Sequence, residues 1–342
     1  MSRLDPLDWA LIRELSGNAR LSYQALARKF NLSSNTVKNR IKKLREQDVI
    51  TGHGTIVSME ILGAEHVAGV ISTDGTEQVI EFMKQVAKQR IVCEIYRTGD
   101  MRYEYWAMVS GASETLGLKK YLGDLDGVIE VEIRPVVFIF PNYPPNYYLN
   151  TRGKKVTFTK HQLRVLRCLY QDARMSVSQI ARDTGMTPRR VRKIIRELEE
   201  GGGIHITTGY NIFAMGDMEY RLKIHFDESQ ISGRDLIMDL YRKYPDEFWW
   251  SSITTNEPIV DVGLIIDRPG KGVFIVQSLK KSAYINSIED YVSYPRVVGN
   301  ILPLRRKLEE ILIEAGVLAE SDIVRNQNTQ LVSDVVDMRD QF

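Results

Sequence analysis

The chain has 342 residues, of which 43% are hydrophobic and 26% are charged, and its formal net charge is +2. This hydrophobic content is enough for folded cores and argues against a disordered chain. No run of eighteen apolar residues occurs, and the N-terminus lacks the apolar core of a signal peptide. We therefore expect a cytoplasmic protein with no membrane-spanning segment.

The N-terminal region predicts three helices followed by two short strands. The helices are expected over residues 5–17, 22–29 and 33–47, and the strands over 49–50 and 54–57. Asp5 and Ser22 suit helix N-caps, and Val37, Ile41 and Leu44 form an apolar stripe at helical spacing. Helix, short helix, tight turn and helix is the helix-turn-helix layout, and the two strands are interpreted as its wing.

A segment of alternating strands and helices comes next. It reads strand 67–72, helix 77–88, strands 91–98 and 103–110, helix 113–122 and strand 128–137. This βαββαβ order predicts an antiparallel sheet with both helices on one face, the ferredoxin-like arrangement.

The second half of the chain repeats both patterns. Helices are expected over 159–171 and 176–184 and from Pro188 onward, with a strand pair near 204–213. The second βαββαβ pattern has strands at 220–226, 248–253, 259–267 and 285–294 and helices at 232–244 and 271–280. A last amphipathic helix over 300–315 has an apolar stripe, which must be buried against the second sheet domain or a partner chain.

These elements predict an α+β fold of tandem winged helix-turn-helix domains, each followed by a ferredoxin-like βαββαβ domain. The expected segments are a first head at 1–63, a sheet domain at 64–140, a linker at 141–155, a second head at 156–216, a second sheet domain at 217–298, the helix at 299–316 and a polar tail at 317–342.

The repetition is visible residue by residue. The stretch that opens with Asn18 runs in register, without a gap, with the stretch that opens with Asp172, so counterparts are 154 residues apart. Each copy ends in a helix rich in Lys and Arg. A repeated basic helix indicates two similar reading heads for one long polyanion.

The third helix of each head carries the candidate contacts to double-stranded DNA. In the first head these are Ser33, Ser34, Asn35, Thr36, Lys38, Asn39, Arg40, Lys42 and Lys43, and in the second Thr187, Arg189, Arg190, Arg192, Lys193 and Arg196. Asn, Lys and Arg in the first turns of such a helix can reach base edges in the major groove. Hydroxyls and N–H groups at the helix start suit a phosphate.

The alternative is that these are ordinary solvated helix faces, or contact surfaces for another protein. The distribution of charge favours DNA, because acids are scarce in the contact half of both helices, where a merely soluble face would mix signs.

The first 60 or so residues resemble the N-terminal signature of the Lrp/AsnC (feast/famine) transcription regulators. The resemblance rests on Leu4-Asp5, Asp8, Leu11-Ile12, Leu15, Asn18 to Ser22, Leu26-Ala27, Leu32-Ser33, Val37, Arg40-Ile41, Leu44, Val49 to Gly52 and Leu62-Gly63. The second half is a more distant copy of the same pair of domains. The family implies sequence-specific DNA binding, assembly through the sheet domains and often an amino-acid effector.

The family's effector loop is expected to read Gly-Asp-x-Asp between the second and third strands of the sheet domain. The candidate loop residues here are Thr98, Gly99, Asp100 and Arg102. Arg102 stands where the second Asp is expected, so a carboxylate that would pair with an amino group has become a cation. The second copy reads Thr255 to Pro258 and has no glycine. Both departures weaken the case for a free amino acid as effector, and the alternative is a sheet that only assembles the protein.

An enzyme is the main alternative, because fused pairs of this architecture also resemble sirohaem decarboxylases. His66, Arg97 and His225 are the candidate members of such a site, although they share no recognisable pattern. Cys93 and Cys168 lie in apolar patterns typical of buried free cysteines. The five histidines have no close His or Cys neighbour of the kind a local zinc site needs. We therefore expect a regulator without metal or cofactor, in which two different heads on one chain read an asymmetric site and two chains form a homodimer.

Overall fold

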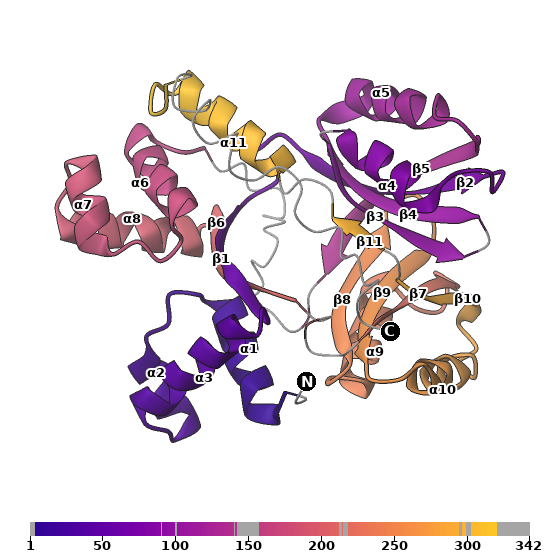
Figure 1. The fold of residues 1–342 in the computed structure, drawn as a ribbon, viewed down its shortest axis with the longest axis horizontal. Helices are drawn as coiled ribbons and strands as arrows, with labels where there is room; N and C mark the ends of the chain where they lie inside the picture. The colour runs from indigo at the N-terminus through magenta and orange to yellow at the C-terminus, as the bar shows by residue number, and fades with distance from the viewer. Residues whose placement is uncertain are drawn as a thin grey trace. The chain divides into compact units, whose positions relative to one another are not determined.

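A computed structural model describes residues 4–89, 91–99, 101–139, 141, 157–211, 214, 218–293, 296–298 and 302–319. The chain forms two compact units (Figure 1), one of residues 1–61 and 140–218 and the other of residues 62–139 and 219–342. The two helix-turn-helix copies thus share one unit and the two sheet domains share the other. The expected linker after residue 141 and the tail after residue 319 lie outside the described residues.

The helices of the first unit follow the sequence expectation closely. They are α1 (Pro6–Gly17), α2 (Tyr23–Phe30), α3 (Ser34–Glu46), α6 (Lys160–Gln171), α7 (Val177–Thr184) and α8 (Pro188–Glu200). The side chains of Asp5, Ser22 and Ser33 each accept a backbone N–H at a helix start. In the turn, Asn31 and its counterpart Gly185 both adopt left-handed backbone, with φ of 54° and 68°. Asn and Gly are the residues that tolerate this conformation.

The strands that follow these helices differ from the expectation. Among the described residues each head supplies one strand, β1 (Ile50–Val57) and β6 (Ile204–Tyr210), and the two strands pair antiparallel with each other. The prediction of a strand pair inside each head is therefore wrong in this detail. A single strand leaves its backbone groups unpaired, and the other copy provides the matching edge.

The register of this pair is symmetric with respect to the repeat. His53 pairs with Thr208 and Gly54 with Thr207, while Thr207 is the counterpart of His53 and Thr208 that of Gly54. Over residues 52–55 and 206–209, exchanging the two copies therefore leaves the pairing unchanged, as in an isologous contact between two subunits. One chain thus contains a pseudo-twofold pair of heads.

The sheet unit contains both predicted βαββαβ patterns. The first consists of β2 (Glu65–Thr73), α4 (Val79–Lys88), β3 (Val92–Gly99), β4 (Arg102–Val109), α5 (Gly111–Gly123) and β5 (Val128–Ile139). The second consists of β7 (Met218–Phe226), α9 (Gly233–Lys243), β8 (Phe248–Thr254), β9 (Ile259–Ile266), α10 (Pro269–Leu279) and β10 (Ile285–Val292). A short strand that the sequence did not reveal, β11 (Arg296–Val298), follows.

The four strands of each domain form a half-sheet. Both edge strands of the first half-sheet, β5 and β3, pair with strands from the second half of the chain. The strand order is β10-β7-β9-β8-β5-β2-β4-β3-β11. The first part of β5 pairs with β2, and its last four residues, 136–139, pair with β8. At the other edge β11, which follows β10 in the chain, pairs with β3. Each domain therefore lends the end of its last strand to the other domain.

Both faces of β4 are buried, and they are covered differently. Tyr103, Tyr105 and Ala107 belong to a core cluster with residues of α4 and α5, which lie on the same side of this sheet (Figure 1). Glu104 and Trp106 alternate with them and lie on the opposite face. There Trp106 meets Trp250 of the second domain edge-on, at 5.0 Å between ring centroids. The second domain thus covers the face that a single ferredoxin-like domain would leave open.

This interior face contains buried charges. Glu104 accepts hydrogen bonds from the hydroxyls of Tyr96 at 2.7 Å and Tyr291 at 2.6 Å, and it pairs with Lys223. Burial raises the pKa of the Glu104 carboxyl, but Lys223 and these hydrogen bonds outweigh burial and hold the pKa below its usual value. Arg221 pairs with Glu94 at 3.2 Å in the first domain. The two domains are therefore linked by ion pairs as well as by strands.

Helix α11 (Leu302–Glu314) corrects a second expectation. It packs against β3 of the first sheet domain, with Leu308 and Leu312 each 1% exposed, and Lys307 lies 3.9 Å from Glu114 of α5. The apolar stripe is thus covered by the first sheet domain, whereas the sequence predicts the second sheet domain or a partner chain as its cover. Among the described residues, no helix combines the length and the apolar composition of a membrane-spanning segment.

We expect Gly263→Ala to destabilise the protein by about 1–3 kcal/mol, because overpacking displaces well-packed neighbours. A Cβ at Gly263 would clash with the Trp250 indole, whose N–H donates to Glu219 at 2.8 Å. Gly117→Ala in α5 is the matched control, since nothing lies within 4 Å of its Cβ position. Chemical denaturation measures both variants, and an equal change in unfolding free energy would contradict the packing argument.

Asp261→Asn is expected to change the pH dependence of stability. Burial raises the pKa of Asp261, and the nearby Glu104 carboxylate raises it further. The cations Lys223, Arg221 and Arg134 lower the pKa, and the result is a pKa of about 7. The folded protein then holds this proton more tightly than the unfolded chain, so the stabilisation is present at low pH and is lost as pH rises towards 7. As pH rises from 5 to 8, we expect the free energy of unfolding of the variant to increase by on the order of 2 kcal/mol relative to that of wild type. Asp239→Asn, on the exposed face of α9, should show no such gain, and a parallel pH profile for both variants would refute the assignment.

Candidate nucleic-acid interface

Helix α3 presents its polar face to solvent. Val37, Ile41 and Leu44 are buried, whereas the candidate contacts Ser33, Ser34, Asn35, Thr36, Lys38, Asn39, Lys42 and Lys43 are exposed. The Ser33 hydroxyl lies 2.8 Å from that of Thr36 and accepts its backbone N–H, which orders the start of the helix. Lys42 lies 3.5 Å from Glu46, a loose exposed pair of little energetic weight.

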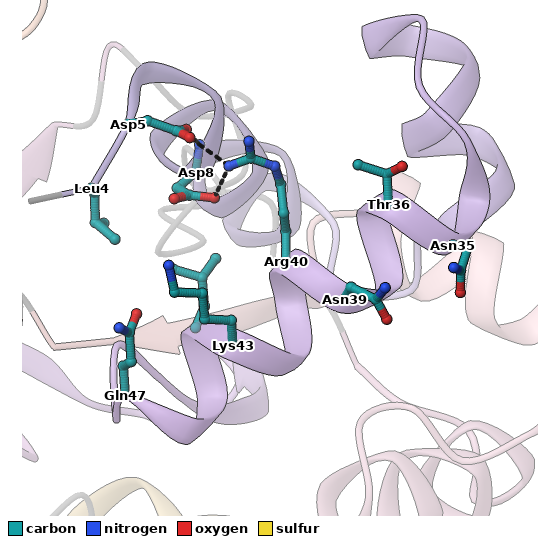
Figure 2. A pocket seen from close by; sticks show the side chains of 10 residues that line it. Leu4, Asp5, Asp8, Asn35, Thr36, Asn39, Arg40, Lys43 and Gln47 are labelled. Atoms are coloured by element: carbon teal, nitrogen blue, oxygen red, sulfur yellow. Dashed lines mark hydrogen bonds and ion pairs between the residues drawn. The ribbon is translucent and has the colours of Figure 1, made fainter. Parts of the chain in front are cut away.

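An open hollow of about 520 Å³ lies along this face (Figure 2). Asn35, Asn39 and Lys43 line it at successive turns of α3, and Asp5 and Asp8 line it from the start of α1. Two amides and an ammonium group spaced one turn apart form a row of groups that can donate hydrogen bonds along one side of a helix.

Arg40 is the candidate whose position differs from the others. Its guanidinium is partly buried and pairs with Asp5 at 2.5 Å and Asp8 at 2.8 Å (Figure 2). These hydrogen bonds raise the pKa of Arg40, and they lower the pKa of Asp5 although burial opposes this. In the second head the counterpart is the buried Ile194. Arg40 thus fastens α3 to α1 in the first head, where the second head uses apolar packing.

Helix α8 has a more strongly basic face. Thr187 caps its start, and Arg189, Arg190, Arg192, Lys193 and Arg196 are exposed, whereas Val191 and Ile195 are buried. Lys193 lies 3.6 Å from Glu197. Within the described part of the chain the four arginines take part in no ion pair, so their charges are available to a polyanion.

The candidate effector loop is engaged within the chain. The Thr98 hydroxyl donates to the Arg102 carbonyl at 3.3 Å, and Arg102 lies 3.8 Å from Glu289 of the second domain. Gly99 ends β3, and Asp100 lies outside the described residues. In the second copy Glu257 lies 3.3 Å from Arg134. The charged side chains described in both loops therefore have partners in the chain.

The residues considered for an enzyme have different surroundings. His66 on β2 packs against Phe138, and burial lowers its pKa to about 4, so the ring is neutral. His225 on β7 lies 3.4 Å from Glu289, and Arg97 lies on β3. Among the described residues no three His, Cys, Asp or Glu side chains are grouped to hold a metal ion.

Sequence reasoning missed two arginines of this unit. Arg20 and Arg174 occupy equivalent positions of the repeat and reach across to the other head. The available signal was their identical place in the two copies.

The fold and the two basic helices define the class of winged helix-turn-helix proteins. A family model described as winged helix-turn-helix DNA-binding matches residues 4–51 and 158–204. The HTH-type transcriptional regulator Ptr1 of Methanocaldococcus jannaschii is 34% identical over 98 residues, which are 28% of this chain and 64% of that protein, slightly under two thirds of its length. An uncharacterised HTH-type transcriptional regulator of Pyrococcus furiosus is 32% identical over 102 residues, 30% of this chain and 67% of that protein.

The regulatory protein AsnC of Escherichia coli is 38% identical over 60 residues, 18% of this chain and 40% of that protein. This chain belongs to the Lrp/AsnC family, in a tandem duplicated form. Among solved structures, the siroheme decarboxylase NirDL superposes with a TM-score of 0.55 over 90% of this chain and 99% of its own, at 12% identity. At that identity the likeness concerns the fold alone.

Proposed function

We propose that the chain is a sequence-specific DNA-binding transcription regulator that uses both heads. The observation that carries the proposal is the pair of exposed basic helices, α3 and α8, within one pseudo-twofold unit. Lys and Arg neutralise phosphates, and residues in the first turns read base edges. Regulators of the same family among the relatives support this function.

The two heads differ in their outward chemistry, so the proposed site is asymmetric. The row Asn35, Asn39 and Lys43 in α3 corresponds to Arg189, Lys193 and Glu197 in α8. Asn suits adenine and Arg suits guanine in the major groove. One head therefore prefers a different half-site from the other.

Selection of bound fragments from random duplex DNA tests the function. The expected result is an enriched sequence with two unlike half-sites and an affinity that falls steeply between 50 and 200 mM salt. Absence of any complex in low salt would show the proposal to be wrong.

No enzymatic step is part of the proposal, and neither is a free amino acid as effector. The interior face between the half-sheets contains the ion pairs of Glu104 with Lys223 and of Arg221 with Glu94. A spectral change of added sirohaem together with loss of a carboxylate would instead support the decarboxylase alternative.

The assembly state stays a prediction. A homodimer, as expected from the sequence, would carry four heads. Light scattering of the free protein and of its DNA complex counts the chains directly.

A further inference from the structure

Arg20 and Arg174 join the two heads. The Arg20 guanidinium donates to the carbonyl oxygens of Ala173 at 2.7 Å and Met175 at 3.0 Å, and Arg174 donates to the carbonyl oxygen of Leu21 at 3.4 Å. Met175 is the counterpart of Leu21, so each arginine reaches the same position of the other copy. The contact is reciprocal across the same pseudo-twofold that relates β1 and β6.

The two loops that carry these arginines have the same local structure. The Arg20 N–H donates to the Asn18 side chain at 2.9 Å, and the Arg174 N–H donates to the Asp172 side chain at 2.8 Å. In both turns the side chain of Asn18 or Asp172 accepts the N–H two residues later, as in an Asx-turn. They direct each arginine towards the other head.

The loop with Arg20 leads into α2, which precedes α3, and the loop with Arg174 leads into α7, which precedes α8. Ser22 and Ser176, which cap α2 and α7, come two residues after the arginines, and the Arg174 guanidinium lies 5.6 Å from the ring centre of Tyr23 at the start of α2. Arg20 is half-buried, and burial lowers its pKa. Its side chain is thus occupied inside the unit.

We propose that Arg20 and Arg174 are positioning residues that set the separation and orientation of α3 and α8, so that one chain accepts two half-sites only at one spacing. This inference rests on the proposed function. A planar guanidinium can donate to two carbonyls at once, as Arg20 does, and so fixes direction as well as distance, whereas a lysine ammonium acts as a point charge.

The experiment compares three duplexes built from the selected site: the native site, the same site with five base pairs inserted between the half-sites, and a single half-site. Five base pairs turn one half-site to the opposite side of the helix. Wild type should lose at least about tenfold in affinity on insertion, because the second head no longer contributes. We call the affinity for the native site divided by that for the inserted site the spacing ratio. In the double variant Arg20→Ala, Arg174→Ala the spacing ratio should fall below about threefold. The affinity of this variant for a single half-site should stay within about twofold of wild type.

Two further variants separate position from charge and from folding. Arg20→Lys keeps the charge and should still reduce the spacing ratio, and a ratio equal to wild type would overturn positioning. Arg174→Lys alone changes the longer of the contacts and provides the test if the double variant does not fold. A spacing ratio of the double variant equal to that of wild type overturns the inference, and so does an equal loss of affinity for the single half-site. Absence of DNA binding by wild type overturns the proposed function itself.

Discussion

Replacing Arg192 by alanine is expected to weaken binding at one half-site by about 1–3 kcal/mol, or ~5- to ~150-fold, and to relax specificity there. Arg192 is exposed on α8 and, within the described residues, takes part in no ion pair. Lys42→Ala in α3 should weaken the other half-site and reduce the salt dependence by about one counterion, as loss of one phosphate contact does. Footprinting at both half-sites, with affinities over a salt series, measures the two effects separately.

Arg242→Ala on α9 is the matched control for these variants. It removes from the sheet unit a cation whose side chain is 69% exposed, as that of Lys42 is 70% exposed, and which pairs with Asp239 at 2.7 Å. We expect no change in the footprint. Equal loss at both half-sites from Arg192→Ala and Lys42→Ala would contradict separate reading by the two heads.

The second large effect is expected from Lys223→Met, which should lower the free energy of unfolding by about 3–5 kcal/mol. Lys223 is 8% exposed and pairs with Glu104, whose remaining oxygen already accepts from Tyr96 and Tyr291. The variant leaves a buried carboxylate without its cation. Denaturant unfolding at pH 7 measures the loss.

The pH dependence gives a further check on this variant. The pKa of Glu104 is depressed in the folded state, so the ion pair stabilises above the unfolded pKa, and this contribution is lost as pH falls through the folded value. The gap between wild type and Lys223→Met should therefore narrow in acid. Lys84→Met, which removes an exposed cation 3.1 Å from Glu81, should change stability by less than about 0.5 kcal/mol. A similar loss in both variants would argue against a buried link between the half-sheets.

The helices were predictable because their signals are local. Apolar spacing identifies the buried face of α3, and Asp5, Ser22 and Ser33 mark helix starts within a residue. The same spacing identifies the candidate contacts by elimination, since the residues left outward are the polar and basic ones. Only Arg40 departs from this group, because its partners Asp5 and Asp8 lie at the start of another helix, α1.

Strand partners were not predictable in the same way. The sequence predicts two strands of a local wing at 49–50 and 54–57, whereas Ile50–Val57 is one strand paired with the segment Ile204–Tyr210 of the other copy. β11 has only three residues and is recognisable only through its pairing with β3. Helix α11 carried a clear apolar stripe, but the stripe alone did not say that β3 would cover it.

The polar face of β7 illustrates the same limit in the sheet unit. Glu219, Arg221 and Lys223 alternate with apolar residues, a pattern typical of a strand with one face in water. All three are buried, because the first domain supplies Glu94 and Glu104 opposite the two cations.

The sequence by itself determined the local elements, the duplication and the two basic helices, since periodicity, caps and charge act over a few residues. Only the tertiary structure decided that the copies pair with each other, head with head and sheet with sheet. The physical reason is that a strand edge or an apolar face specifies what kind of surface must cover it, and many distant segments satisfy that demand. The segment that covers a given edge or face is selected by strand register and complementary charge. Register and charge complementarity depend on both copies at once, so only the folded chain shows them.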